Sequence, residues 1–109
     1  MNFFKKSYDQ LIKEAISILL QVKDKIKDDS DCIYTYYETP EEMRNEIDKY
    51  VLELEKGSMF LLDEMYTHFL PTAAYQEHSM GNNWTIEYHK LAARFDKVYE
   101  KIKSYNGNS

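Results

Sequence analysis

Apolar side chains recur at helical spacing along most of this chain, and that spacing constrains its fold more than any other feature. Only three glycines and two prolines occur among the 109 residues, too few for a fold built from many short strands and turns. The first stripe places its residues on one face of an amphipathic helix near 3–27. It consists of Tyr8, Leu11, Ile12, Ala15, Leu19, Val22 and Ile26.

Local capping signals mark a second helix near 40–56. Thr39 can cap it, Pro40 fits the first helical position, and Glu42 completes a capping box. Carboxylates in this first turn also favour the positive end of the helix dipole. Gly57 is expected to end the helix in the left-handed conformation.

Two further helices are expected, at 58–70 and 84–104, and Pro71 ends the first of them. Between them, residues 71–83 show no clear pattern and are predicted to form an irregular loop. The short connections elsewhere favour helices that run antiparallel to their neighbours. Residues 1–109 are therefore predicted to be a single all-α domain, an antiparallel four-helix bundle with one longer loop before the last helix.

Residues 32–38 read Cys-Ile-Tyr-Thr-Tyr-Tyr-Glu, a composition that suits an extended strand. No second convincing strand exists to pair with this segment, and a lone strand cannot satisfy its backbone. We therefore interpret it as a linker that is packed by its tyrosines. Cys32 is the only cysteine, which excludes an internal disulfide and fits a reducing compartment.

The formal net charge of −5 is unevenly distributed along the chain. Residues 29–83 hold twelve Asp and Glu against three Lys and Arg, a net charge of −9. Such a surface repels nucleic acid and attracts basic proteins. Ile16–Leu20, the longest nearly apolar stretch, is too short to span a bilayer, and no signal-peptide pattern is found. We expect a cytoplasmic protein without a nucleic-acid or membrane partner.

No set of residues indicates catalysis or metal binding. Cys32 lacks the context that would lower its pKa. Glu64 precedes His68 by four residues and Glu87 precedes His89 by two, so neither forms the Glu-x-x-His repeat of di-iron bundles. No catalytic residue, metal site or cofactor is therefore predicted, and an enzyme is not expected. We interpret the three histidines as surface residues, with His68 able to pair with Glu64: they are His68, His78 and His89.

A tyrosine-rich segment directly precedes the acidic second helix and is a candidate interface. Tyrosine is enriched at protein interfaces, but its rings can equally fill gaps between short helices. Alternation favours one buried and one exposed side. Glu42, Glu46 and Glu53 are expected to share one helical surface that faces water. The candidate partner-binding residues are Tyr34, Tyr36, Tyr37, Glu41, Glu42, Glu46 and Glu53.

Three motifs in the last forty residues resemble a small bacterial all-helical family. They are Pro71-Thr72-Ala73-Ala74-Tyr75-Gln76-Glu77, Asn82-Asn83-Trp84 and Phe95-Asp96. The family pattern is a Pro-Thr-Gly-x-x-Gln-Glu turn, an Asn-Gly-Trp helix start and a downstream Phe-Asp. The resemblance implies immunity-type proteins encoded beside polymorphic toxins. The chain departs from the pattern at Ala73 and Asn83, which replace two glycines.

The same motifs have a structural interpretation. Gln76 and Glu77 can hydrogen-bond the exposed backbone of the 71–83 loop. Trp84, at the start of the last helix, can pin the loop to the bundle. Gln76, Glu77 and Trp84 therefore form either a structural clasp or part of a ligand site.

Three functions stay open at this point. The first is a non-catalytic protein-binding module, such as an immunity protein or antitoxin that neutralises a basic partner. The second is a small-ligand or metal-binding bundle that uses the 71–83 loop with His68, His78 and Glu77. The third is a structural homo-oligomer whose acidic face only keeps it in solution.

Overall fold

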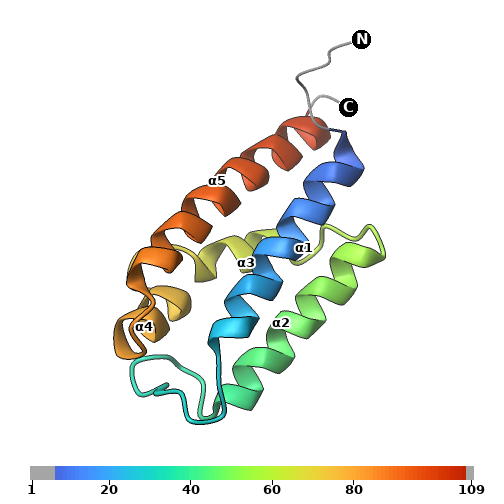
Figure 1. The fold of residues 1–109 in the computed structure, drawn as a ribbon. Helices are drawn as coiled ribbons and strands as arrows, with labels where there is room; N and C mark the ends of the chain where they lie inside the picture. Colours follow the sequence, from blue (N-terminus) through green and yellow to red (C-terminus); the bar gives the residue numbers. More distant parts are fainter. Residues whose placement is uncertain (1–6, 108–109) are drawn as a thin grey trace.

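The computed structural model describes residues 7–107, and within them the chain forms five helices and no strand. The all-α prediction is confirmed, and residues 32–38 form turns and bends, not a strand. The predicted helix start at residue 3 lies outside the described residues. No helix within 7–107 combines the length and hydropathy needed to cross a bilayer. The helices are α1 (Tyr8–Lys25), α2 (Pro40–Glu55), α3 (Leu62–His68), α4 (Ala74–Gly81) and α5 (Thr85–Gly107) (Figure 1).

Short-range capping fixes where the first two helices begin and end. Ser7 and Gln10 form a reciprocal capping box at the start of α1. The Thr39 side chain accepts a hydrogen bond from the Glu42 backbone N–H at 3.1 Å, which confirms the predicted start of α2. Gly57, with φ of 80°, ends α2 as expected, because this left-handed conformation strains residues that carry a Cβ.

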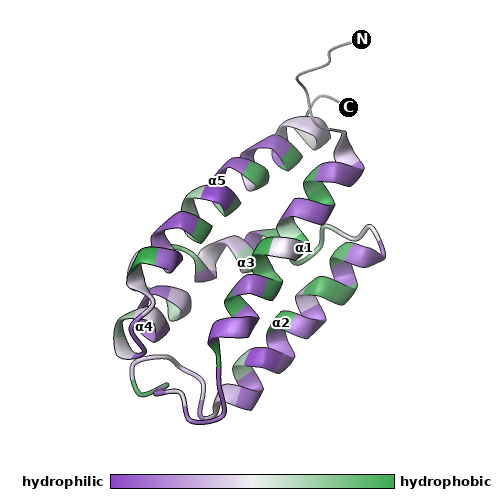
Figure 2. Cartoon of the chain, viewed as in Figure 1, coloured by the Kyte–Doolittle hydropathy of each residue, from purple (hydrophilic) through white to green (hydrophobic). Residues whose placement is uncertain are grey.

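The core lies where α1 packs against both α5 and α2 (Figure 1). Apolar stripes run along all three helices, with polar residues on their outer faces (Figure 2). The Tyr8 and Tyr105 rings meet edge to face at 5.4 Å, which brings the start of α1 beside the end of α5. The largest fully buried side chains are Tyr50, Tyr75, Phe95, Leu11, Ile18, Leu19, Met43, Ile47, Leu54, Leu62, Met65 and Ile102.

The prediction of an irregular loop at 71–83 was wrong, because most of this segment forms α4. Two of the four residues that this helix buries are polar, His78 and Ser79. Because this eight-residue helix buries polar as well as apolar side chains, its sequence shows no apolar stripe at helical spacing that would predict a helix. Its packing on α5 and α3 stabilises it instead. The helix predicted at 58–70 is also shorter than expected, since only α3 is helical there.

Candidate functional site

The segment between α1 and α2 has no regular secondary structure, yet hydrogen bonds hold it in place. The Asn82 side chain, at the end of α4, accepts from the Asp31 N–H and donates to the Asp31 carbonyl, each at 2.8 Å. The Thr35 hydroxyl donates to the Cys32 carbonyl at 2.8 Å and accepts from the Tyr37 N–H at 3.2 Å. The segment is therefore ordered by local turns and by a tether to a distant helix.

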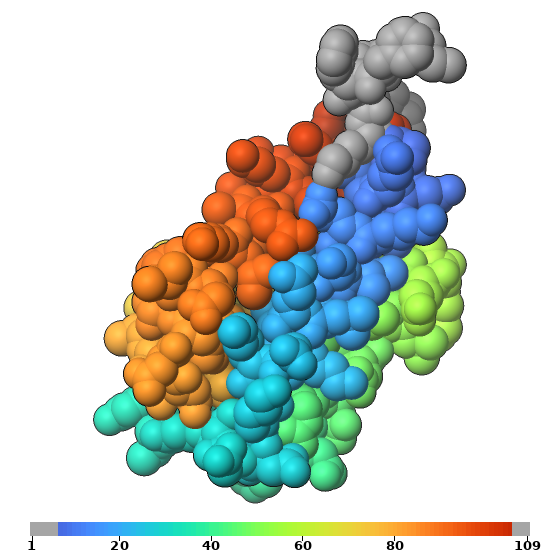
Figure 3. Space-filling model, viewed as in Figure 1, coloured from blue at the N-terminus to red at the C-terminus, as the bar shows by residue number. Residues whose placement is uncertain are grey.

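Three large side chains of this segment are mostly exposed to solvent, although the Tyr36 hydroxyl also lies within 3.3 Å of His68. Ile33, Tyr34 and Tyr36 are 73%, 77% and 67% exposed, whereas Tyr37 is only 8% exposed. The tyrosines therefore divide between an exposed and a buried side, as their alternation favoured. In the space-filling view the segment lies at the lower end of the molecule, beside the start of α2 (Figure 3). We call Ile33, Tyr34 and Tyr36 the exposed aromatic edge.

A polar cluster forms where the buried side of this segment covers α2 and α3. The Tyr37 hydroxyl donates to Glu46. The Tyr50 hydroxyl donates to Glu64 at 2.6 Å, and its oxygen lies 2.8 Å from Nε2 of His68. Nε2 of His68 also lies 3.1 Å from a Glu46 oxygen. The members of this polar cluster are Tyr36, Tyr37, Glu46, Tyr50, Glu64 and His68.

The sequence held a partial signal for this cluster. Glu46 and Tyr50 are spaced i, i+4 on α2, and Glu64 and His68 are spaced i, i+4 on α3, so each pair shares a helical face. That the two faces meet under the linker follows only from the tertiary arrangement. The sequence alone therefore predicts at most a Glu64–His68 pair, without the carboxylate of Glu46.

Two carboxylates in the polar cluster have no cationic side chain to balance them. Among the described residues, Glu46 and Glu64 form no ion pair with Lys or Arg. Burial, followed by the hydrogen bond to Glu46, raises the pKa of Tyr37 far above its ordinary value. Burial and the hydrogen bond to Glu64 do the same to the pKa of Tyr50. Both hydroxyls therefore stay protonated and act as donors to the carboxylates.

The predicted acidic surface of α2 is divided in the structure. Glu41 and Glu42 are exposed in the first helical turn. Glu53 is half-buried and lies 3.5 Å from Lys56. The expectation that Glu46 faces water was wrong: it is half-buried in the polar cluster, because the linker folds back over that side of α2.

The interpretation of all three histidines as surface residues was wrong for two of them. His68 is 5% exposed and His78 is fully buried, whereas His89 is exposed. Each buried ring finds a hydrogen-bonding aromatic partner. The Tyr50 hydroxyl contacts His68, and the Trp84 indole N–H donates to Nδ1 of His78 at 2.8 Å. These partners offset the cost of removing an imidazole from water.

The proposed clasp residues differ in their contacts. The Gln76 side chain accepts a hydrogen bond from the Thr72 backbone N–H at 2.5 Å and so ties the first turn of α4 to the residues before it. Trp84 joins the start of α5 to α4 through His78, whereas the half-buried Glu77 side chain makes no hydrogen bond within the described residues. Asn83, which replaces a family glycine, has φ of 64°, a left-handed conformation that Asn tolerates.

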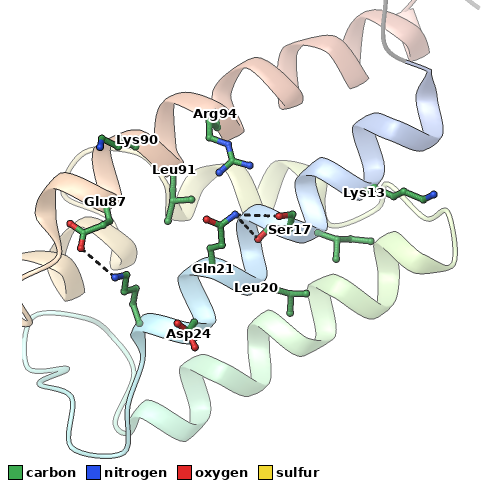
Figure 4. A pocket seen from close by; sticks show the side chains of 11 residues that line it. Lys13, Ser17, Leu20, Gln21, Asp24, Glu87, Lys90, Leu91 and Arg94 are labelled. Atoms are coloured by element: carbon green, nitrogen blue, oxygen red, sulfur yellow. Dashed lines mark hydrogen bonds and ion pairs between the residues drawn. The ribbon is translucent and has the colours of Figure 1, made fainter.

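A hollow of about 870 Å³ lies along the groove between α1 and α5, away from the polar cluster (Figure 4). Two of its charged side chains, Lys25 and Glu87, pair at 3.3 Å, and Arg94 lies 2.9 Å from Glu14, which is outside the lining. Leu91 contributes to an apolar part of its lining. The groove gathers no cluster of half-buried titratable groups, so the polar cluster is the stronger candidate site.

Burial lowers the pKa of both His68 and His78, although carboxylates oppose the shift: Glu46 and Glu64 at His68, and Asp31 at His78. In the unfolded chain both imidazoles take up a proton near the ordinary pKa of about 6.5. The unfolded state therefore binds more protons than the folded state once the pH drops below that value. Stability is fully present above about pH 6.5 and is lost as the pH falls toward the lowered folded-state values.

We expect the melting temperature, followed by circular dichroism, to fall between about pH 6.5 and pH 5, a range above the ordinary carboxylate pKa values. The double variant His68→Gln/His78→Gln should flatten this part of the profile. His89→Gln, which changes an exposed histidine, serves as the matched control and should keep the fall. A wild-type melting temperature that stays constant or rises on acidification would contradict the expectation.

Comparison with known proteins finds no matching family model, no matching curated protein and no matching solved structure. The resemblance to immunity-type proteins therefore stays a prediction drawn from a few motif residues.

Proposed function

We propose that this chain is a non-catalytic protein-binding module that captures a basic protein partner, in the manner of an immunity protein or antitoxin. The observation that carries the proposal is the exposed aromatic edge. Three large side chains stand more than two-thirds clear of the molecule on a segment that hydrogen bonds hold in place. An ordered, exposed apolar edge supplies contact area at low entropic cost, as interface anchors do.

Exposed acidic residues flank the exposed aromatic edge along the sequence. Asp29, Glu38, Glu41 and Glu42 are exposed, and none of them forms an ion pair within the described residues. The nearby Asp28 is paired with Arg44 at 2.6 Å. Free carboxylates around an apolar centre resemble the charged rim of an interface, which steers a basic partner and speeds its association.

The proposal treats α1, α2 and α5 as an antiparallel bundle that acts as the rigid support for this edge, with α3 and α4 packed against it. Binding by such a module requires no large change of shape. A homo-oligomer is the main competitor, since the exposed aromatic edge could contact its own copy. Light scattering of the purified chain distinguishes the two, because a dimer that buries Tyr34 and Tyr36 would leave no free edge for a partner.

Charge reversal and tyrosine truncation should separate the electrostatic steering of the partner by the acidic residues from its anchoring by Tyr34. Partners are first captured from a lysate on the immobilised wild-type chain, and the basic protein retained is then used for kinetics. Glu41→Lys/Glu42→Lys should slow association by roughly tenfold and weaken its salt dependence. Tyr34→Ala should instead speed dissociation, since it removes a desolvated anchor. Surface plasmon resonance at two salt concentrations measures both effects.

Two control variants match these changes elsewhere on the molecule. Glu100→Lys reverses an exposed acid on α5, and Phe60→Ala removes a side chain that is 87% exposed in the turn after α2. Both should bind the partner as the wild type does. If the two test variants change the affinity by less than about threefold, or if the controls weaken binding while the test variants do not, the partner binds another surface and the proposal fails.

A further inference from the structure

Three potential metal ligands converge in the polar cluster. Glu46, Glu64 and His68 each offer one ligand atom, and these atoms all lie within 4.8 Å of one another. Two come from one face of α3, and the third comes from the neighbouring α2. Ligands carried on packed helices are held at a fixed spacing, so small rotations of the side chains would bring them around one ion.

The charge of the polar cluster favours a cation. Two carboxylates lie beside a histidine whose burial opposes protonation, and no Lys or Arg pairs with either of them among the described residues. At present the hydroxyls of Tyr37 and Tyr50 donate to Glu46 and Glu64. A hydroxyl dipole offsets less of a buried negative charge than a divalent ion does.

Tyr75 supplies a second and independent observation. Its side chain is fully buried, and its hydroxyl has no hydrogen-bond partner among the described residues. Its ring lies 5.4 Å from the ring of His68, and after burial the charges of Glu46 and Glu64 contribute to raising its pKa. This unpartnered side chain therefore borders the polar cluster through its contact with His68, and a water bound to a metal ion there would give its hydroxyl a partner.

An open hollow connects the polar cluster to solvent. It has a volume of about 450 Å³ and opens beside Glu64 and His68. A site with three protein ligands keeps a fourth coordination position for water or a small ligand, and it needs a route by which the ion enters. The hollow provides both. Its other lining residues include Tyr36, Thr67 and Thr72.

We propose that Glu46, Glu64 and His68 bind a divalent transition-metal ion of the zinc class, with a water in the fourth position facing the hollow. One imidazole and two carboxylates suit zinc, manganese or ferrous iron, whereas magnesium and calcium favour sites made of oxygen ligands alone. The site does not rest on the proposed protein-binding function, because its ligands come from α2 and α3 and not from the exposed aromatic edge. It departs from the sequence-based expectation that the chain has no metal site.

The test uses the untagged full chain after treatment with a chelator. Titration with zinc chloride in a calorimeter should show one ion bound per chain, and the melting temperature should rise by about 5 °C or more at saturation. Magnesium chloride in excess should neither reproduce the rise nor compete. Cobalt(II) should give the visible absorption bands of a four-coordinate ion, a readout that needs no variant.

Ligand variants locate the site. Glu64→Gln keeps an acceptor for Tyr50 and should fold, yet it should weaken zinc binding at least tenfold, as should His68→Gln. Glu55→Gln on α2 and His89→Gln on α5 change exposed residues, and Cys32→Ser removes the only thiol. These three should bind zinc as the wild type does. Zinc binding weaker than about 0.1 mM, or equal loss in the controls and the ligand variants, would overturn the assignment.

Discussion

Replacing Phe95 by alanine should lower the free energy of unfolding by about 3–5 kcal/mol. The ring is fully buried in the middle of α5 and stacks on Phe69 with centroids 4.4 Å apart. Phe69 in turn packs edge to face on Tyr75, 4.9 Å away. Removing the Phe95 ring therefore leaves a cavity at the point where α3, α4 and α5 meet.

The surrounding helices cannot easily close that cavity. Two hydrogen bonds join α3 to α5, from Tyr66 to Asp96 at 2.6 Å and from Tyr99 to Asp63 at 2.7 Å. The Tyr66 and Tyr99 rings also stack 4.0 Å apart. Because these contacts fix the spacing of the two helices, we expect the loss to lie in the upper part of the range, since its size depends on how far a site can collapse.

Urea unfolding followed by circular dichroism measures the loss. Phe95→Leu, which keeps most of the volume, should cost less than about 1.5 kcal/mol. Lys97→Ala changes an exposed residue on the same helix and should stay within about 0.5 kcal/mol of the wild type. A loss of less than about 0.5 kcal/mol for Phe95→Ala would mean that α5 is rotated from its described position.

Trp84→Ala should cost about 3–5 kcal/mol and should also release α4 from the core. The indole is 3% exposed, and its N–H donates to the buried His78. The substitution removes this apolar volume and leaves Nδ1 of His78 without a donor. Trp84→Phe separates the two effects, because it keeps most of the ring while losing the N–H. Its loss should be about 1–3 kcal/mol.

Limited proteolysis detects the local part of this effect. In Trp84→Ala, the rate of cleavage within 72–83 should rise more than the lower free energy of unfolding of the whole chain predicts. The reason is that α4 makes few contacts with the rest of the protein, so it can open locally. Ile86→Ala alters a side chain that is 70% exposed in the same helical turn as the control. If cleavage of the 72–83 segment is unchanged in Trp84→Ala, the indole does not hold α4 in place.

The parts of the fold that sequence predicted well depend on contacts between near neighbours in the chain. The start of α2 at Thr39 and Pro40 and its end at Gly57 each involve only a few consecutive residues. Such signals are complete within the local sequence. The apolar stripes of α1 and α5 are similarly local, because each helix face repeats with the helical period.

The parts that sequence did not predict depend on distant contacts. α4 forms although two of its buried residues are polar, because the Trp84 indole donates to Nδ1 of His78 and the Gln76 carbonyl accepts from Ser79; Nε2 of His78 has no partner among the described residues. The polar cluster joins residues from the linker, α2 and α3, and only the tertiary fold brings them together. Spacing within one helix could suggest the Glu64–His68 pair, but not the carboxylate of Glu46 beside it.

The edge-to-face contact between Tyr8 and Tyr105 has a practical consequence for how the protein can be handled. The contact holds the start of α1 and the end of α5 together at one end of a molecule 48 Å long. The linker between α1 and α2 lies at the opposite end (Figure 1). A fluorophore, affinity handle or surface tether attached near either extremity therefore stands a full molecular length from the exposed aromatic edge. Immobilised through either extremity, the chain presents that edge outward, away from the support.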